Sequence, residues 1–277
     1  MKFGRINLNV DYRRAGAGKT DDYKPYMDAY MLDDPCTPRL RPAVIICPGG
    51  GYEFTSEREG EPVAMQLLAK GIQSFILWYS VRPAVFPMAL LELAVAVETV
   101  RKHAKEWNID PDKIFVMGFS AGGHLAGSLS TMWNKGFLAD TLNTSEEMIR
   151  PNGSILCYPV ITSGEYAHRG SFDALLRGMT DDYLEVTSLE KQVDKETPPT
   201  FIWHTWTDGL VPVENTLLYV DALRKHGVNA EVHIFSEGHH GLSLATRETG
   251  DEPLRESVLP AIQAWMPLCI TWIENLS

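Results

Sequence analysis

Five short apolar runs recur along the chain and constrain its fold more than any other feature. They are rich in β-branched and aromatic residues, are bounded by Gly, Pro or Asp, and occupy residues 43–47, 73–79, 113–119, 153–161 and 200–206. Such runs are typical of buried strands. Helical patterns lie between most of them, including 61–71, which ends on Gly71, and 87–108, which begins at Pro87. Strands that alternate with helices predict an α/β fold, with a mostly parallel central sheet and helices on both faces.

The C-terminal part of the chain continues this pattern. A helix is predicted over 214–227, and the alternating residues 230–235 predict a strand near the sheet edge. The segment 256–276 predicts a closing helix that is interrupted by Pro260 and Pro267. The alternation therefore extends to the end of the sequence.

The chain has 277 residues, a length that suits one large α/β domain, and residues 1–277 are predicted to form it. No internal repeat and no low-complexity linker divides the sequence. The segment 161–199 lies between two predicted strands, is mostly polar, and is too short for an independent domain. We therefore expect it to form a small insertion at the rim of a pocket.

The balance of charge argues against several classes of partner. Asp and Glu number 36 against 25 Lys and Arg, and the net charge of −11 repels phosphate backbones and anionic lipids. No stretch approaches the roughly 18 apolar residues of a membrane span, and the N-terminus lacks the apolar core of a secretory signal. We therefore expect a cytoplasmic protein, either a monomer or a homo-oligomer, that binds neither nucleic acid nor membranes.

The four cysteines are far apart, and none forms a CxxC pair or a ligand cluster. They are predicted to be reduced packing residues: Cys36, Cys47, Cys157 and Cys269. Three histidines near the C-terminal strand, His233, His239 and His240, raise the alternative of a metal site, but the chain has no HExxH motif. We expect no metal and no cofactor.

Residues Gly118 to Gly122 read GFSAG, a GxSxG motif between a predicted strand and a helix that begins with small residues. A serine on so sharp a turn needs neighbours without bulk two residues away on either side, and both glycines meet this need. The turn would project Ser120 from the carboxyl edge of the sheet and place the N–H of Ala121 at a helix N-terminus. Ser120 is the predicted nucleophile; the alternative is a tight turn without chemistry.

A serine hydroxyl needs an imidazole to remove its proton and a carboxylate to orient that imidazole. Asp208 follows one predicted strand, and His239 and His240 follow the next, so the order Ser, Asp, His is that of α/β-hydrolases. We predict His240 as the base because Gly241 gives the loop freedom to place the ring. His239 is the alternative base, and an Asp–Gly turn is the alternative for Asp208.

A further oxyanion donor is expected in the loop after an early strand. Residues 47–54 read CPGGGYEF, and three consecutive glycines let backbone N–H groups approach a ligand closely. Gly50 and Gly51 are the predicted donors beside Ala121, and a flexible turn is the alternative.

Several aromatic and histidine side chains flank these segments in sequence. Three aromatic residues are predicted to wall an acyl or sugar pocket, with core packing as the alternative for each: Tyr52, Phe119 and Trp206. His124, four residues after the serine, is predicted to support the turn, and His204 to be a strand residue near the sheet edge.

Five motifs occur in order between residues 40 and 245: PGGGY, YSVRP, WNIDPDKIFVMGFSAGGHLA, HTWTDGLVPVEN and GHHGLSLA. Together they resemble the α/β-hydrolase esterases of the acetylesterase and acetylxylan-esterase type, akin to the feruloyl-esterase-like and hormone-sensitive-lipase-like groups. The resemblance implies a nucleophile, an acid, a base and an oxyanion hole at Ser120, Asp208, His240 and around Gly50, Gly51 and Ala121. One departure is that the HGGG of many such esterases reads PGGG here, so the histidine that usually braces this loop is absent.

The predicted activity is hydrolysis of carboxylic esters through an acyl-enzyme. The small insertion and the acidic charge favour soluble short-chain esters, and the resemblance implies acetyl esters of sugars or xylo-oligosaccharides. One alternative is a serine peptidase of the prolyl-oligopeptidase type, although such enzymes usually have a large second domain and a Tyr where this chain has Ala121. The other is a ligand-binding protein on the same fold, which predicts a broken triad.

Overall fold

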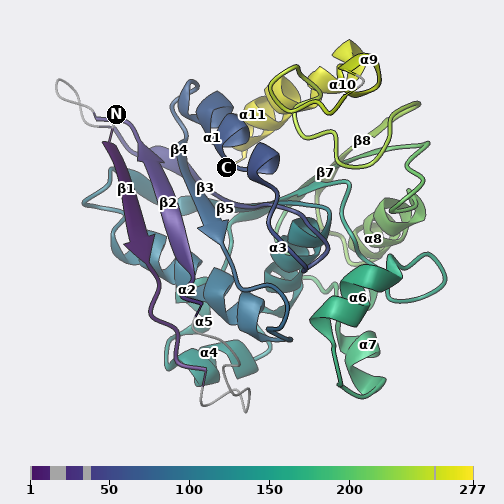
Figure 1. Cartoon of the computed structure of the whole chain (residues 1–277). Coiled ribbons are helices and arrows are strands. Elements are labelled where there is room, and N and C mark those ends of the chain that lie inside the picture. Colours follow the sequence, from purple (N-terminus) through teal and green to yellow (C-terminus); the bar gives the residue numbers. More distant parts are fainter. Residues whose placement is uncertain (1, 13–22, 34–38, 253, 277) are drawn as a thin grey trace.

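The central feature of the computed structural model, which describes residues 2–12, 23–33, 39–252 and 254–276, is one eight-stranded sheet (Figure 1). Its strands follow the order β1-β2-β4-β3-β5-β6-β7-β8. Their bounds are Lys2–Asn7 (β1), Tyr26–Met31 (β2), Arg41–Cys47 (β3), Gln73–Trp78 (β4), Ile109–Phe119 (β5), Gly153–Cys157 (β6), Thr200–Thr205 (β7) and Ala230–Phe235 (β8). Strands β3 to β8 pair in parallel, whereas β2 is antiparallel to both β1 and β4. The predicted α/β class with a mostly parallel sheet is confirmed.

Helices cover both faces of this sheet (Figure 1). They are α1 (Glu61–Leu68), α2 (Met88–Lys102), α3 (Ala121–Met132), α4 (Phe137–Leu142), α5 (Glu146–Ile149), α6 (Arg169–Leu175), α7 (Asp182–Val186), α8 (Glu214–Lys225), α9 (Leu254–Ser257), α10 (Pro260–Gln263) and α11 (Trp265–Asn275), with the short 3-10 helices η2 (Glu57–Glu59) and η3 (Leu189–Lys191). Strand β3 shows how one strand serves two cores. Ile45 packs into the core that includes α2, α3 and α8, while Ile46 packs into the core that includes α1 and α11. Both faces of the sheet are therefore buried, as its apolar runs require.

The first two strands were not predicted from the sequence. Strand β1 reads KFGRIN and has no apolar run, and Asp28 interrupts the apolar pattern of β2. In the structure the Asp28 carboxylate accepts hydrogen bonds from Arg5 at 2.9 Å and from the Trp78 indole at 2.9 Å. These tertiary partners make a buried aspartate compatible with a strand.

The C-terminal segment differs from the expectation at one proline. Pro260 begins α10, as a residue without an N–H can. Pro267, however, lies within the first turn of α11 and does not interrupt it. The first N–H groups of a helix have no partner inside the helix, so a proline costs little there.

The cysteines of the described residues are buried and free: Cys47, Cys157 and Cys269. Cys36 lies outside the described residues. None of the helices in the described part of the chain has the length and apolarity needed to cross a bilayer. Within the same ranges, no group of three His, Cys, Asp or Glu side chains is arranged to hold a metal ion.

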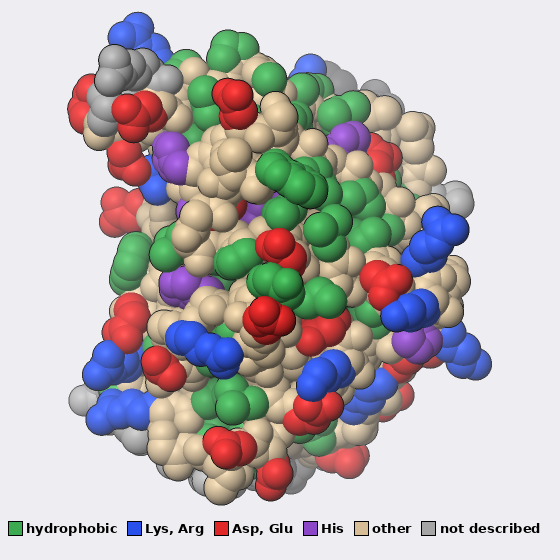
Figure 2. All heavy atoms as spheres, turned by 90° about the vertical axis from the view of Figure 1, so that its right-hand side faces the viewer, with side chains coloured by type: hydrophobic (Ala, Val, Ile, Leu, Met, Phe, Trp, Pro, Cys, Tyr) green, Lys and Arg blue, Asp and Glu red, His purple; other side chains and the backbone are tan. Residues whose placement is uncertain are grey.

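Strand β8 forms one edge of the sheet, as its alternating pattern predicts. On the neighbouring helix α8, Leu217 and Leu218 are exposed. Figure 2 shows the side of the molecule that lies to the right in Figure 1, where exposed hydrophobic side chains are interspersed with acidic and basic ones. This face is therefore of mixed character, without an extended stripe of one charge among its described residues.

Candidate active site

Ser120 occupies the turn between β5 and α3 with a backbone conformation that side chains rarely adopt. Its φ is 53° and its ψ is −119°. A Cβ on Gly118 would lie 2.0 Å from the Gly122 carbonyl oxygen, and a Cβ on Gly122 would lie 2.1 Å from the Cys47 carbonyl oxygen. Only glycine fits at either position, so the GxSxG motif is the condition for folding this turn.

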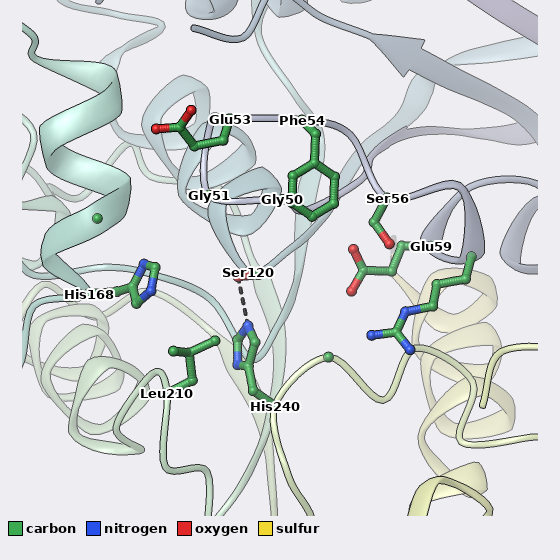
Figure 3. A pocket seen from close by; sticks show the side chains of 13 residues that line it. Gly50, Gly51, Glu53, Phe54, Ser56, Glu59, Ser120, His168, Leu210 and His240 are labelled. Carbon is green, nitrogen blue, oxygen red and sulfur yellow. Dashed lines mark hydrogen bonds between the residues drawn. The ribbon is translucent and has the colours of Figure 1, made fainter. Parts of the chain in front are cut away.

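The structure brings Ser120, His240 and Asp208 together at the carboxyl edge of the sheet, from the turn after β5 and the loops after β8 and β7. Figure 3 shows Ser120 and His240 facing each other. His240 Nδ1 lies 2.7 Å from Asp208 Oδ2, and His240 Nε2 lies 2.7 Å from Ser120 Oγ. Because a carboxylate only accepts hydrogen bonds, Nδ1 carries the proton and Nε2 accepts from the serine hydroxyl. An imidazole held in this tautomer can remove the serine proton when the hydroxyl attacks a carbonyl.

His239, the alternative base, is directed elsewhere. Its Nδ1 lies 2.7 Å from the carbonyl oxygen of His240, and its Nε2 lies 3.4 Å from Ser257 Oγ. Of the two adjacent histidines, His240 is the one that the structure places against Ser120.

The Asp208 carboxylate is completely buried and surrounded by donors. Its Oδ1 accepts the backbone N–H groups of Leu210 and Val211, each at 2.9 Å, while Oδ2 accepts from His240. Burial alone would raise the pKa of this carboxyl. Hydrogen bonds from His204, His240 and the Val211 N–H outweigh burial and hold the pKa of Asp208 well below its usual range. The group is therefore ionised at neutral pH.

The sequence predicts His204 to be a strand residue near the sheet edge, and the structure adds a link to the site that the sequence pattern does not indicate. His204 lies on β7, next to the edge strand, and is fully buried. Its Nε2 lies 3.3 Å from Asp208 Oδ2 and 3.0 Å from the Val211 carbonyl oxygen. Both neighbours are acceptors, so Nε2 carries the proton, and Nδ1 accepts from the Thr216 hydroxyl at 2.8 Å. A histidine in a strand of otherwise buried residues needs polar partners, and that was the available signal.

The glycine loop after β3 lies beside Ser120. Gly50 and Gly51 both line the pocket, with φ values of 127° and 66°. Among the described residues, neither glycine donates its N–H to another protein group. Ala121 is the first residue of α3, where N–H groups lack partners within the helix. These three N–H groups are therefore available to a developing oxyanion.

Two side chains brace this loop in place of the histidine of HGGG. The Tyr79 hydroxyl donates to the Pro48 carbonyl at 2.6 Å, and the Glu59 carboxylate accepts the Gly49 N–H at 2.8 Å. Neither role was predicted. A buried glutamate just before an amphipathic helix was the available signal for Glu59, because a buried carboxylate needs donors.

A pocket of about 440 Å³ opens above Ser120 and His240 (Figure 3). His168 and Leu210 lie on one side, and Phe54 and Glu59 lie on the other. His168 precedes α6, within the segment 161–199 that was predicted to form a rim. Burial and the electrostatic effect of the neighbouring His240 lower the pKa of His168. We conclude that the insertion contributes a neutral imidazole to the pocket.

The predicted aromatic walls are not those of the pocket. Phe119 is fully buried and packs against Tyr158 and Trp265, in the core that includes α11. Alternation along β5 turns it away from the site. Tyr52 is buried and hydrogen-bonded to another side chain, and Trp206 is 60% exposed outside the pocket. These three assignments are corrected: Phe54 and Leu210 supply the apolar lining instead.

His124 joins three segments behind the elbow. Its Nδ1 lies 2.9 Å from the Tyr52 hydroxyl, and its Nε2 lies 2.8 Å from the Thr187 carbonyl oxygen. Burial lowers the pKa of His124 to about 4, although the Thr187 carbonyl opposes this shift. A neutral His124 thus ties the glycine loop and the insertion to α3.

Comparison with known proteins shows the family to which the chain belongs. Residues 27–223, more than half of the chain, match the BD-FAE family. The chain is 39% identical over 233 residues to endo-1,4-beta-xylanase B of Butyrivibrio fibrisolvens, covering 81% of this chain and 35% of that protein. It is 32% identical over 234 residues to the acetylxylan esterase of Xylanibacter ruminicola, covering 82% of this chain and 45% of that protein. The chain thus spans less than half the length of these two relatives.

Solved structures match over nearly the whole chain. The acetyl ester-xyloside bifunctional hydrolase from Caldicellulosiruptor lactoaceticus is 38% identical, with a TM-score of 0.83 and coverage of 98% of this chain and 96% of that one. The carboxylesterase Cest-2923 from Lactobacillus plantarum is 27% identical, with a TM-score of 0.85 and coverage of 99% and 98%. The chain belongs to the BD-FAE family, among the esterases of the α/β-hydrolase fold.

Proposed function

We propose that the protein is a serine carboxylesterase that hydrolyses short-chain esters, acetyl esters above all, carried by sugars or xylo-oligosaccharides. The unbroken hydrogen-bond chain from Ser120 through His240 to Asp208 carries this proposal. A ligand-binding protein without turnover would have no need of this chain, and that alternative predicted a broken triad.

The proposed reaction follows from the positions of these groups. His240 Nε2 takes the proton of Ser120 as Oγ attacks the ester carbonyl carbon. The resulting oxyanion accepts hydrogen bonds from the N–H groups of Ala121 and of the Gly50–Gly51 loop. The tetrahedral adduct expels the alcohol, which receives the proton from His240. Water then gives a proton to His240 and attacks the acyl-serine, which releases the acid and regenerates the hydroxyl. Asp208 holds the tautomer and stabilises the imidazolium.

The lining of the pocket supports an alcohol rich in hydroxyl groups. Four residues with polar side chains are among those that line the cavity: Glu53, Ser56, Arg58 and His168. The names of two similar proteins, an acetylxylan esterase and an acetyl ester-xyloside hydrolase, agree with such a substrate. A small acyl group is supported because the insertion 161–199 forms only short helices at the rim.

A series of p-nitrophenyl esters from acetate to octanoate, measured beside acetylated xylo-oligosaccharides, tests the proposal. We expect kcat/KM to be highest for acetate and to fall about tenfold or more by octanoate. Ser120→Ala should lower kcat on the order of 10⁴-fold or more. Ser128→Ala is the matched control, since Ser128 is a buried serine of α3 outside the pocket.

Three outcomes would contradict the proposal. A kcat/KM that rises along the series and is highest for octanoate would contradict the short-chain assignment. Faster cleavage of a Pro-linked amide than of the acetyl ester would favour a peptidase. Full activity in Ser120→Ala would contradict the assignment of Ser120 as the nucleophile.

A further inference from the structure

Glu59 is a buried carboxylate at the edge of the pocket whose two oxygens are both occupied by protein donors. It is 3% exposed and ends η2. Its Oε2 accepts the Gly49 N–H at 2.8 Å, and its Oε1 accepts the Tyr158 hydroxyl at 2.7 Å. One side chain therefore connects the glycine loop to the segment that follows β6.

Tyr158 carries this connection to the loop of the candidate base. Its hydroxyl oxygen accepts the Ser243 N–H at 2.9 Å. Its ring lies edge-on to the His240 ring, with centroids 5.0 Å apart and an interplanar angle of 71°. Tyr158 thus contacts His240 through its ring and holds the residues that follow His240 through its hydroxyl.

The base loop is held at the same residue by two further groups. The Ser243 hydroxyl donates to the Arg58 carbonyl at 2.8 Å, and the Trp265 indole donates to the Ser243 carbonyl at 3.0 Å. Ser243 has a φ of 50°, in the left-handed region. A non-glycine residue keeps this conformation only where its surroundings determine it, so the hydrogen bonds with Arg58 of η2, with Tyr158 after β6 and with Trp265 of α11 define the course of the loop.

We infer that Glu59 and Tyr158 are positioning residues that fix the oxyanion-binding loop relative to His240. The inference rests on the proposed function. In ester cleavage the oxyanion donors and the base must act on the same carbonyl group at once, yet they belong to loops nearly 200 residues apart, Gly49–Gly51 and His240–Ser243. Displacement by about 1 Å can cost about 10²-fold in rate. The Gly49–Glu59–Tyr158–Ser243 chain is a direct route between the two loops.

The direction of each hydrogen bond explains why a carboxylate stands at this position. Ser243 N–H donates to the Tyr158 oxygen, Tyr158 O–H donates to Oε1, and Gly49 N–H donates to Oε2. Both ends of the Glu59 carboxyl must therefore accept. A glutamine of the same shape would turn an NH₂ group towards one of these donors, so Glu59→Gln breaks the chain without opening a cavity.

A double-mutant cycle with Glu59→Gln and Tyr158→Phe tests this inference on p-nitrophenyl acetate. Titration of active sites with a phosphonate gives the fraction of folded, reactive enzyme, and every rate is divided by that fraction. We expect each single variant to lower kcat about tenfold or more and to change KM by less than about threefold. We expect the double variant to be little worse than the poorer single variant, because both changes break one chain.

Tyr219→Phe is the matched control for Tyr158→Phe. Tyr219 is a fully buried tyrosine of α8 that does not line the pocket. We expect its removal to leave kcat per titrated site unchanged.

A second readout separates positioning from general loosening of the fold. A trifluoromethyl ketone forms a hemiketal when Ser120 Oγ adds to its carbonyl carbon, and the adduct presents an oxyanion to the same N–H groups. Its affinity for each variant should fall by about the same factor as kcat/KM. Unchanged kcat per titrated site in Glu59→Gln or in Tyr158→Phe would overturn the inference. So would losses that multiply in the double variant. A wild-type enzyme that neither reacts with the phosphonate nor cleaves the ester would instead overturn the proposed function itself.

Discussion

At the scale of single residues, the site depends on backbone strain and on buried hydrogen bonds. The positive φ of Ser120 requires Gly118 and Gly122, and this requirement is local, so the motif predicts the turn from sequence alone. The support of Asp208 by His204 is different: the two residues are only four apart in sequence, but their side chains meet because of the course of the loop after β7. The space around one turn therefore predicted the nucleophile, whereas the conformation of a loop revealed the group that supports the acid.

His204→Leu removes a donor to the Asp208 carboxylate. Because hydrogen bonds lower the pKa of Asp208, its ionised form stabilises the folded protein above the unfolded value of about 3.9, and this contribution is lost as the pH falls through the folded value. With one donor fewer the folded pKa rises, so we expect acid unfolding, followed by tryptophan fluorescence, to begin at a higher pH. We also expect kcat at pH 7 to fall about tenfold.

His204→Gln is the conservative partner of this variant. Its side-chain amide can still donate towards Asp208, so it should recover part of the acid stability and of kcat. His226→Leu, at the end of α8 and outside the pocket, should change neither. An acid transition in His204→Leu at the wild-type pH would contradict the role assigned to His204.

At the scale of elements, the strands place the site and the loops shape it. The five apolar runs predicted the strands from β3 to β7, because both faces of a parallel sheet are buried. The polar β1 and the aspartate-containing β2 escaped prediction, since their pairing depends on partners elsewhere in the chain. The insertion 161–199 was recognised by its polarity, but the contribution of His168 became visible only when α6 was placed beside Ser120.

His168→Ala tests the contribution of the insertion to substrate binding. Its ring faces the pocket from the start of α6, and Nδ1 is held by the Ser171 hydroxyl at 2.8 Å. We expect KM for acetylated xylo-oligosaccharides to rise about tenfold, because one hydrogen-bonding group for the sugar is lost. The kcat/KM for p-nitrophenyl acetate should change less than about threefold. An equal loss on both substrates would show that His168 does not contact the sugar.

At the scale of the whole molecule, α11 packs on one face of the sheet and supports the loop of the candidate base. Trp265 at the start of α11 is fully buried, stacks on Trp203 of β7 with centroids 5.3 Å apart, and donates to the Ser243 carbonyl. One side chain thus links the last helix, the sheet and the loop after His240. The packing of α11 against the sheet therefore also positions the loop that carries His240.

Trp265→Ala should destabilise the protein by about 3–5 kcal/mol, because it removes a large core side chain and leaves the Ser243 carbonyl without its indole donor. Urea unfolding measures this change. Leu268→Ala on the same helix is the control: this leucine is 38% exposed, so we expect a loss of less than about 1.5 kcal/mol. Equal losses in the two variants would contradict the role of the Trp203–Trp265 stack.

The alternation of strands and helices, the elbow at Ser120 and the order of the candidate serine, acid and base could all be predicted from the sequence. Each of these follows from constraints within a few residues: burial of both sheet faces, the space around one turn, and the direction of parallel strands. Three features became clear only from the folded molecule. His240 rather than His239 faces Ser120, and Phe54 and Leu210 rather than Phe119 and Trp206 line the pocket. Glu59 joins two loops. These outcomes depend on the relative positions of loops far apart in the chain, and packing of the whole molecule sets those positions.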